Sequence, residues 1–186
     1  MTRGAILNLT PEQIVDRALS ACVPPMDPDE VIWYCSTPGL NGGADPTAET
    51  CASVNPKSKV RSADCVGFLA WAAGFDRRQP VRCRTMEWVN QNSMIADAAR
   101  PAGDGMFRRL LAPRLGCFAA IRDIPPTLTS KKRTGHVAIV TSLDPLYVTH
   151  CSPSNHRRVL QGIAQTTLAQ AFLGRVKDVV WLERVT

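Results

Sequence analysis

The segment Ser-Ala-Asp-Cys-Val-Gly-Phe-Leu-Ala-Trp, residues 62–71, constrains the fold of this chain more than any other. Its apolar residues continue at helical spacing as far as Gly74, where a glycine is typical of a helix end. Its small side chains allow a helix to pack closely against a sheet. We therefore predict a buried helix that starts near Asp64, with Ser62 as its N-cap and Asp64 adding negative charge to the first turn.

This helix places Cys65 in its first turn, where the backbone N–H groups and the helix dipole stabilise a thiolate. Two short apolar strands follow downstream, and each carries a histidine. His136 opens the strand over 136–140, and His150 lies in the strand over 148–152. A thiol on a helix, followed by imidazoles on strands, is the pattern of a nucleophile and its general base.

Whether His150 can meet His136 depends on the connection between their strands. A five-residue loop over 142–146 places Ala138 opposite His150 and puts both histidines on one face, whereas a two-residue turn puts them on opposite faces. A proline inside this segment favours the longer loop. We expect His150 to fix the tautomer of His136, because a general base needs a third group to orient it. Asn155 and His156 are the competing candidates for that role.

The length of 186 residues fits one domain, and a hydrophobic content of 45% with 20% charged residues is globular rather than disordered. The net charge of +6 favours an anionic partner. The basic residues are scattered in small groups without interleaved aromatic residues, so we expect no nucleic-acid binding. No run of eighteen apolar residues exists, and the apolar start of the chain is too short for a signal peptide, so we expect neither membrane insertion nor a conventional leader.

The seven cysteines are an odd number, so at least one thiol stays unpaired, and a Cys35–Cys51 disulfide remains open. No CxxC pair is present, which argues against structural zinc. A metal site built from His150, Cys151 and His156 is disfavoured because adjacent strand residues point to opposite faces. We expect no metal and no cofactor.

The chain has one predicted domain, 1–186, with four parts. They are an N-terminal helix over 10–23, a Gly/Pro-rich cleft loop over 34–61, a core over 62–155, and a C-terminal helix and strand within 156–186. Within these parts the patterns also predict a helix over 85–99, a strand over 114–121, a polar basic loop over 122–134, a helix over 168–173 and a strand over 179–185. Helices followed by antiparallel strands indicate an α+β fold with the helices on one side of a small sheet.

Three segments resemble the NlpC family of papain-like cell-wall peptidases. Members of that family carry Asp-Cys-Ser-Gly-Phe at a helix start, then a Gly-His-Val-Gly-Ile strand, then a third polar residue on a further strand. The matching segments here, within roughly residues 30–155, are 64–68 (Asp-Cys-Val-Gly-Phe), 135–139 (Gly-His-Val-Ala-Ile) and 150–152 (His-Cys-Ser). Val66 replaces the serine after the nucleophile, and Cys117 replaces an aspartate of the family.

The resemblance implies a papain-like fold and a cysteine amidase or endopeptidase that hydrolyses amide bonds of peptidoglycan stem peptides, beside a D-glutamyl residue and a diamino acid. Cys65 is then the nucleophile, His136 the base and His150 the orienting group. The corresponding substrate-binding residues are Tyr34, Asp64 and Gly135.

A wall hydrolase without a signal peptide must reach its substrate by lysis or by a dedicated secretion machine. We favour an antibacterial effector made in the cytoplasm and secreted into the periplasm or wall of a target bacterium, with an immunity protein as partner. The alternatives are a phage endolysin, an NlpC-like thiol acyltransferase or amidase on a non-wall substrate, and a non-catalytic scaffold domain.

Overall fold

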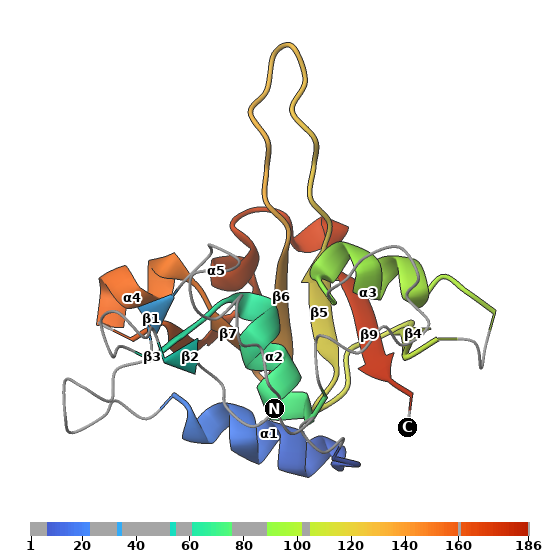
Figure 1. Ribbon diagram of the computed structural model, residues 1–186, viewed down its shortest axis with the longest axis vertical. Helices are drawn as coiled ribbons and strands as arrows, with labels where there is room; N and C mark the ends of the chain where they lie inside the picture. Colours follow the sequence, from blue (N-terminus) through green and yellow to red (C-terminus); the bar gives the residue numbers. More distant parts are fainter. Residues whose placement is uncertain are drawn as a thin grey trace.

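The computed structural model describes residues 7–22, 33–34, 53–54, 61–75, 89–101, 105–159 and 161–185. Its centre is a six-stranded antiparallel sheet in the order β4-β9-β5-β6-β7-β8 (Figure 1). The strands are β4 (Phe107–Leu110), β5 (Phe118–Ile121), β6 (His136–Leu143), β7 (Leu146–Cys151), β8 (Ile163–Thr167) and β9 (Val180–Arg184). The short strands β1 (Trp33–Tyr34), β2 (Ser53–Val54) and β3 (Arg61–Ala63) form a second sheet.

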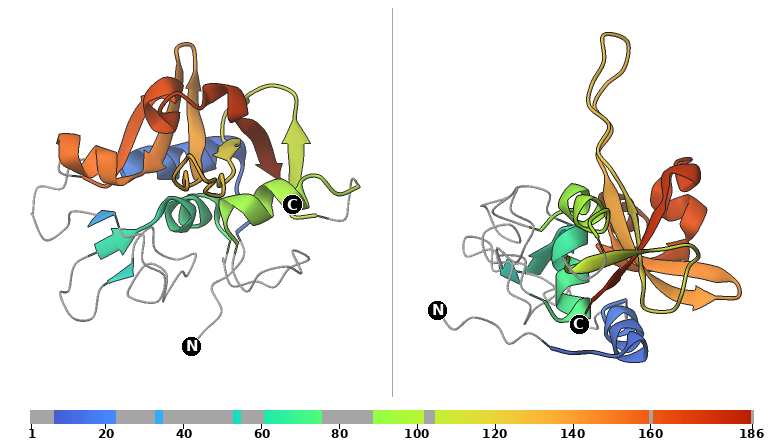
Figure 2. Two further views of the ribbon diagram at one scale, coloured as in Figure 1. Left: turned by 90° about the horizontal axis from the view of Figure 1, so that it is seen from above. Right: turned by 90° about the vertical axis from the view of Figure 1, so that its right-hand side faces the viewer.

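Helices cover both faces of the large sheet. One face packs against α1 (Pro11–Ser20), α2 (Cys65–Ala73) and α3 (Gln91–Asp97), and the other against α5 (Leu168–Phe172), as the two views of Figure 2 show. The short α4 (Pro153–Val159) and the 3-10 turn η2 (Val176–Asp178) complete the described elements. The α+β class is confirmed. The prediction that all helices share one side is wrong, because β5 and β6 present apolar residues to both faces.

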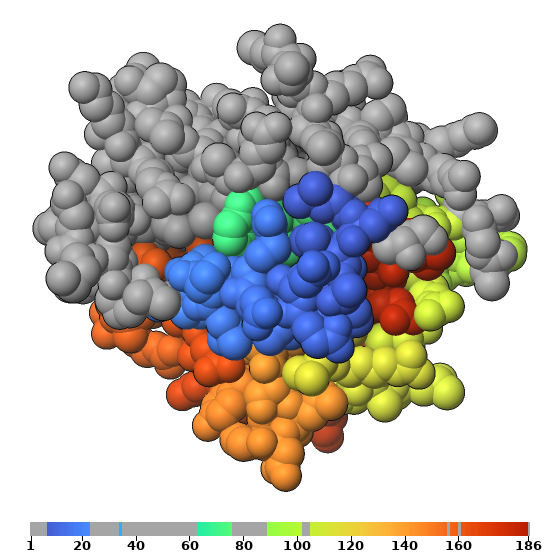
Figure 3. All heavy atoms as spheres, turned by 90° about the horizontal axis from the view of Figure 1, so that it is seen from below, coloured from blue at the N-terminus to red at the C-terminus, as the bar shows by residue number. Residues whose placement is uncertain are grey.

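The N-terminal helix α1 forms where the sequence predicts it. The Thr10 hydroxyl accepts a hydrogen bond from the Gln13 backbone, and the Gln13 side chain accepts one from the Thr10 backbone, which closes a capping box. Ile14 and Ala18 are buried against the core, while the outer side of the helix lies on the molecular surface (Figure 3).

The predicted buried helix is α2, but its cap differs from the prediction. Ser62 lies in β3, and the N-cap is Asp64, whose Oδ1 accepts a hydrogen bond from the Gly67 backbone at 2.6 Å. A carboxylate three residues before an N3 amide is well placed for this bond, and Cys65 consequently becomes the first helical residue. The helix ends at Gly74, whose φ of 69° suits glycine.

The connection between β6 and β7 is shorter than predicted. The five-residue loop over 142–146 is wrong, because Leu143 pairs with Leu146 around a two-residue turn at 144–145. Such a turn alone would place the two histidines on opposite faces of the sheet.

A β-bulge at Thr141 restores the register that the short turn would have lost. Beyond the bulge Ile139 pairs with Thr149, and the same register continued places His150 opposite the residue before Ile139. His136 and His150 therefore lie on the same face, which confirms that part of the prediction. A bulge adds one residue to one strand, so every side chain beyond it points to the opposite face of the sheet from the one it would have without the bulge.

Several other elements differ from the sequence patterns. The helix predicted over 85–99 is described only as α3, and the strand predicted over 114–121 starts at Phe118. The segment between the predicted strand over 148–152 and the predicted helix over 168–173, for which no element was predicted, contains α4 and β8. The cleft loop over 34–61 and the Cys35–Cys51 pair lie largely or wholly outside the described residues. None of the described helices is long and apolar enough to cross a membrane.

Candidate functional site

His136 and His150, two of the three predicted catalytic residues, are in direct contact. His136 Nε2 lies 2.7 Å from His150 Nδ1, and the two rings are nearly perpendicular, with 83° between their planes. His150 is buried, with 2% of its surface exposed, and His136 is half-buried with its ring against the edge of Phe172 from α5. The bulge in β6 makes this contact possible, since it brings both side chains to one face.

A chain of hydrogen bonds lies behind the pair and indicates which ring nitrogens carry protons. The Thr166 hydroxyl in β8 donates to the Thr167 carbonyl at 3.2 Å, and its oxygen lies 3.1 Å from His150 Nε2. With the hydroxyl proton on the Thr167 carbonyl, we assign the Thr166 oxygen as the acceptor of His150 Nε2–H. His150 Nδ1 is then an acceptor, and His136 donates to it through Nε2–H. His136 Nδ1 is left with the lone pair that a general base needs.

Asn155 supports this arrangement from α4 and does not replace His150. Its amide group donates to the His150 carbonyl at 2.9 Å and to the Gly162 carbonyl at 3.3 Å, and the same nitrogen lies 3.4 Å from His150 Nε2. Asn155 is therefore a support behind His150. The side chain of His156, the other competing candidate, lies outside the described residues.

The surroundings keep both imidazoles neutral. Burial lowers the pKa of His136 from 6.5 to about 4. Burial, together with repulsion from His136 and Arg158, lowers the pKa of His150 to about 2. At neutral pH neither ring carries a charge, so His136 can accept a proton.

Cys65, the predicted nucleophile, is a buried thiol at the first position of α2, with 8% of its surface exposed. Helix α2 packs against β6 and β7, the strands that carry the histidines. The end of β3, which leads directly into α2, is attached to β7, because Cys151 Sγ donates to the Ala63 carbonyl at 3.3 Å. Cys151 directly follows His150, and adjacent strand residues point to opposite faces. This bond therefore attaches β7 to the start of α2, while the side chains of His150 and His136 point to the other face of the sheet, which α5 covers.

A pocket of about 430 Å³ opens beside the histidines. Four of the predicted site residues line it, namely Tyr34, Gly135, His136 and His150. Cys65 and Asp64 are not among its lining residues. The Asp64 carboxylate caps α2 instead, and a role for Asp64 in substrate binding stays a prediction.

Gly135 is buried where a side chain has no room. A Cβ at this position would lie 2.5 Å from the Ile121 carbonyl oxygen and 2.8 Å from the Asp123 backbone nitrogen. Both are backbone atoms, so the contact cannot be relieved by a side-chain rotation. The glycine therefore lets β6 start close to β5 and sets the position of His136, the next residue.

Thr166, which completes the hydrogen-bond chain, was not predicted from the sequence. It lies in the segment Ile-Ala-Gln-Thr-Thr, whose residues alternate only weakly between apolar and polar, and a threonine in such a strand has no distinctive pattern. Knowledge that β7 pairs with β8 would have indicated Thr166 as a neighbour of His150. Thr166 pairs with Val148 and lies two residues from the partner of His150, on the same face.

The other described thiols differ from Cys65 in their settings. Burial raises the pKa of Cys22 and of Cys117 to about 11, so both remain protonated at neutral pH. Cys151 is buried and donates to a carbonyl. Within the described residues no three His, Cys, Asp or Glu side chains are grouped so that they could hold a metal ion.

Comparisons with known proteins add no family or relative: the chain matches no protein-family model, and no curated protein is similar to it.

Proposed function

We propose that the protein is a cysteine amidase or endopeptidase with an NlpC-type, papain-like fold, in which Cys65 is the nucleophile, His136 the general base and His150 the orienting group. The observation that carries this proposal is the 2.7 Å contact between His136 Nε2 and His150 Nδ1. It is the contact between a base and its orienting group that such a triad requires.

The reaction begins when the Cys65 thiol gives its proton to His136 Nδ1 and its sulfur attacks the amide carbonyl. The electron pair of the carbonyl moves to oxygen, and backbone N–H groups at the start of α2, most simply that of Cys65, stabilise this oxyanion. The C–N bond then breaks, and His136 Nδ1–H protonates the leaving amine. A thioester on Cys65 remains.

Water completes the cycle. His136 Nδ1 takes a proton from the attacking water, the new C–O bond forms, and the C–S bond breaks. The proton on His136 returns to the sulfur, and the acid product leaves. Throughout, His150 accepts the hydrogen bond from His136 Nε2–H and holds the ring in the tautomer that exposes Nδ1.

The proposed substrate is the peptidoglycan stem peptide, which comes from the resemblance of segments 64–68, 135–139 and 150–152 to NlpC peptidases. The net charge of +6 supports it, because a basic protein is attracted to an anionic wall. The proposed setting is an antibacterial effector that acts in the periplasm or wall of a target bacterium, and the proposed partner is an immunity protein in the producing cell.

The test is mass spectrometry of purified peptidoglycan after incubation with the wild-type protein, with Cys65→Ser and with Cys22→Ser. Cys22 is a matched control, because it is a half-buried thiol outside the site with a raised pKa. We expect new stem-peptide fragments from wild type and Cys22→Ser, and none from Cys65→Ser. Intact peptidoglycan after incubation with folded wild-type protein would refute the wall assignment, and fragments from Cys65→Ser would refute the nucleophile.

A further inference from the structure

The pocket beside the histidines contains positive charge without negative charge. Among the described residues that line it, Arg133 and Arg175 are cationic and none is an aspartate or glutamate. Hydroxyl groups of Thr134, Ser152 and Ser154 add hydrogen-bonding capacity. A pocket of this composition suits an anionic ligand.

The two arginines differ in what they already bind. Arg175 is buried, and its Nε donates to Asp178 Oδ2 at 3.0 Å, so a carboxylate already balances its charge. Its other nitrogens donate to the Arg122 carbonyl at 2.8 Å and to the Thr134 carbonyl at 3.4 Å. Arg133 is exposed and forms no ion pair with a described residue. Arg133 is therefore the cation that can receive a ligand.

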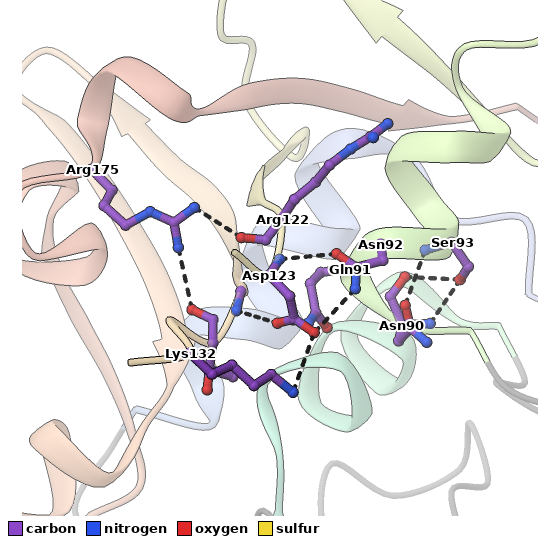
Figure 4. A network of polar contacts seen from close by, with 10 residues as sticks. Asn90, Gln91, Asn92, Ser93, Arg122, Asp123, Lys132 and Arg175 are labelled. Carbon is purple, nitrogen blue, oxygen red and sulfur yellow. Dashed lines mark hydrogen bonds and ion pairs between the residues drawn. The ribbon is translucent and has the colours of Figure 1, made fainter. Parts of the chain in front are cut away.

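Arg133 lies at the base of the projecting loop over 122–135, and its backbone is held in place. Ile124 and Arg133 exchange two backbone hydrogen bonds of 2.8 and 3.1 Å. Arg175 holds the same base through its bonds to the carbonyls of Arg122 and Thr134 (Figure 4).

Helix α3 holds the base of the same loop from the opposite side, through contacts to Asp123. The Asp123 carboxylate accepts hydrogen bonds from Gln91 Nε2 and Asn92 Nδ2, both at 3.1 Å, and from the Gly135 backbone (Figure 4). Asn92 Oδ1 in turn accepts from the Asp123 backbone at 3.0 Å. The backbone of Arg133 is therefore fixed from both sides before a ligand binds, so only the freedom of its side chain is lost on binding.

We propose that Arg133 binds a carboxylate of the substrate in this pocket, so that the enzyme selects amides with an acidic residue beside the bond that is cut. A guanidinium group presents parallel N–H donors that match the two oxygens of a carboxylate. The identity of the acidic substrate rests on the proposed function, in which D-glutamyl and diamino-acid carboxylates flank the scissile amide.

The test measures binding apart from catalysis, by titration calorimetry on the full chain carrying Cys65→Ser. The two probes are the tripeptide L-Ala-γ-D-Glu-diaminopimelate and its analogue with the carboxylates amidated. We expect the acidic peptide to bind more tightly, and Arg133→Gln to weaken its binding about tenfold or more while leaving the amidated analogue unchanged. Arg133→Lys keeps the charge but not the paired donors, and should fall between the two.

Lys131→Gln is the matched control, because Lys131 is an exposed cation of the same loop that does not line the pocket. Equal binding of both peptides, equal effects of Arg133→Gln and Lys131→Gln, or no binding of either peptide would each overturn the proposal. Arg133-dependent binding of an acidic peptide that wild-type protein fails to cut would support the carboxylate site and refute the hydrolase.

Discussion

The buried histidine pair makes a specific prediction about stability and pH. We expect the free energy of unfolding to fall when the pH is lowered from 7 to 5, and we expect His150 to account for much of the loss. In the folded protein the pKa of His150 is lowered to about 2, whereas an unfolded chain restores a value near 6.5. Below pH 6.5 the unfolded state therefore binds more protons than the folded state, and stability decreases as the pH falls.

The magnitude follows from that difference in proton binding. At pH 5 His150 is neutral in the folded protein, whereas it is protonated in nearly every unfolded molecule. Between pH 7 and pH 5 His150 therefore lowers the free energy of unfolding by about 2 kcal/mol. His136, with its pKa lowered to about 4, adds a smaller amount of the same sign, because solvent screens a half-buried ring.

The measurement is urea unfolding at pH 7 and pH 5, followed by the fluorescence of the four tryptophans, for wild type and His150→Asn. Asparagine retains a polar group near His136 but has no proton to gain in this range. We expect the difference in unfolding free energy between the two pH values to shrink by about 2 kcal/mol in the variant. The reasoning is wrong if the variant shows the same pH dependence as wild type, whatever its stability at pH 7.

Further predictions concern the groups around the proposed base, His136, and the proposed nucleophile, Cys65. Thr166→Val should lower kcat about tenfold with KM unchanged, and Thr166→Ser should restore it; equal losses in both variants would mean that the hydroxyl does not set the tautomer. Asp64→Asn keeps the helix cap but removes its charge, so iodoacetamide should alkylate Cys65 faster at pH 6, while Asp64→Ala should lower the unfolding free energy by about 1 kcal/mol. Gly135→Ala should cost about 1–3 kcal/mol in thermal unfolding because its Cβ meets backbone, and a neutral result would show that the strand start can move. The acid limb of kcat/KM should follow the lowered pKa of His136, near 4; a limb near 6.5 would place that ring in water.

Local features of this fold could be predicted from the sequence. The capping box of α1, the end of α2 at Gly74, and the strands that carry His136 and His150 all depend on residues close together in the chain. Short-range patterns of apolar spacing and capping determine such elements, so they are visible without any knowledge of tertiary contacts.

The relation between the two histidines could not be derived in the same way. The prediction placed them on one face, but through a loop that does not exist, and the bulge at Thr141 compensates for the short turn. A bulge leaves no periodic pattern, because one additional residue in a strand resembles any other strand residue. The contribution of Thr166 was also hidden, since it depends on the pairing of β7 with β8 rather than on local sequence.

The structure also changes the expected charge of the resting site. The sequence suggests a thiolate at Cys65, because a helix N-terminus favours negative charge. Two features oppose this state: the Asp64 carboxylate already occupies that N-terminus, and the surroundings of His136 disfavour a positive imidazole. A thiolate and an imidazolium would each be disfavoured, so these features favour a neutral Cys65 thiol and a neutral His136 imidazole. In the proposed reaction the proton moves to His136 only as the substrate carbonyl arrives, and the oxyanion formed at the start of α2 then offsets the cost of separating charge.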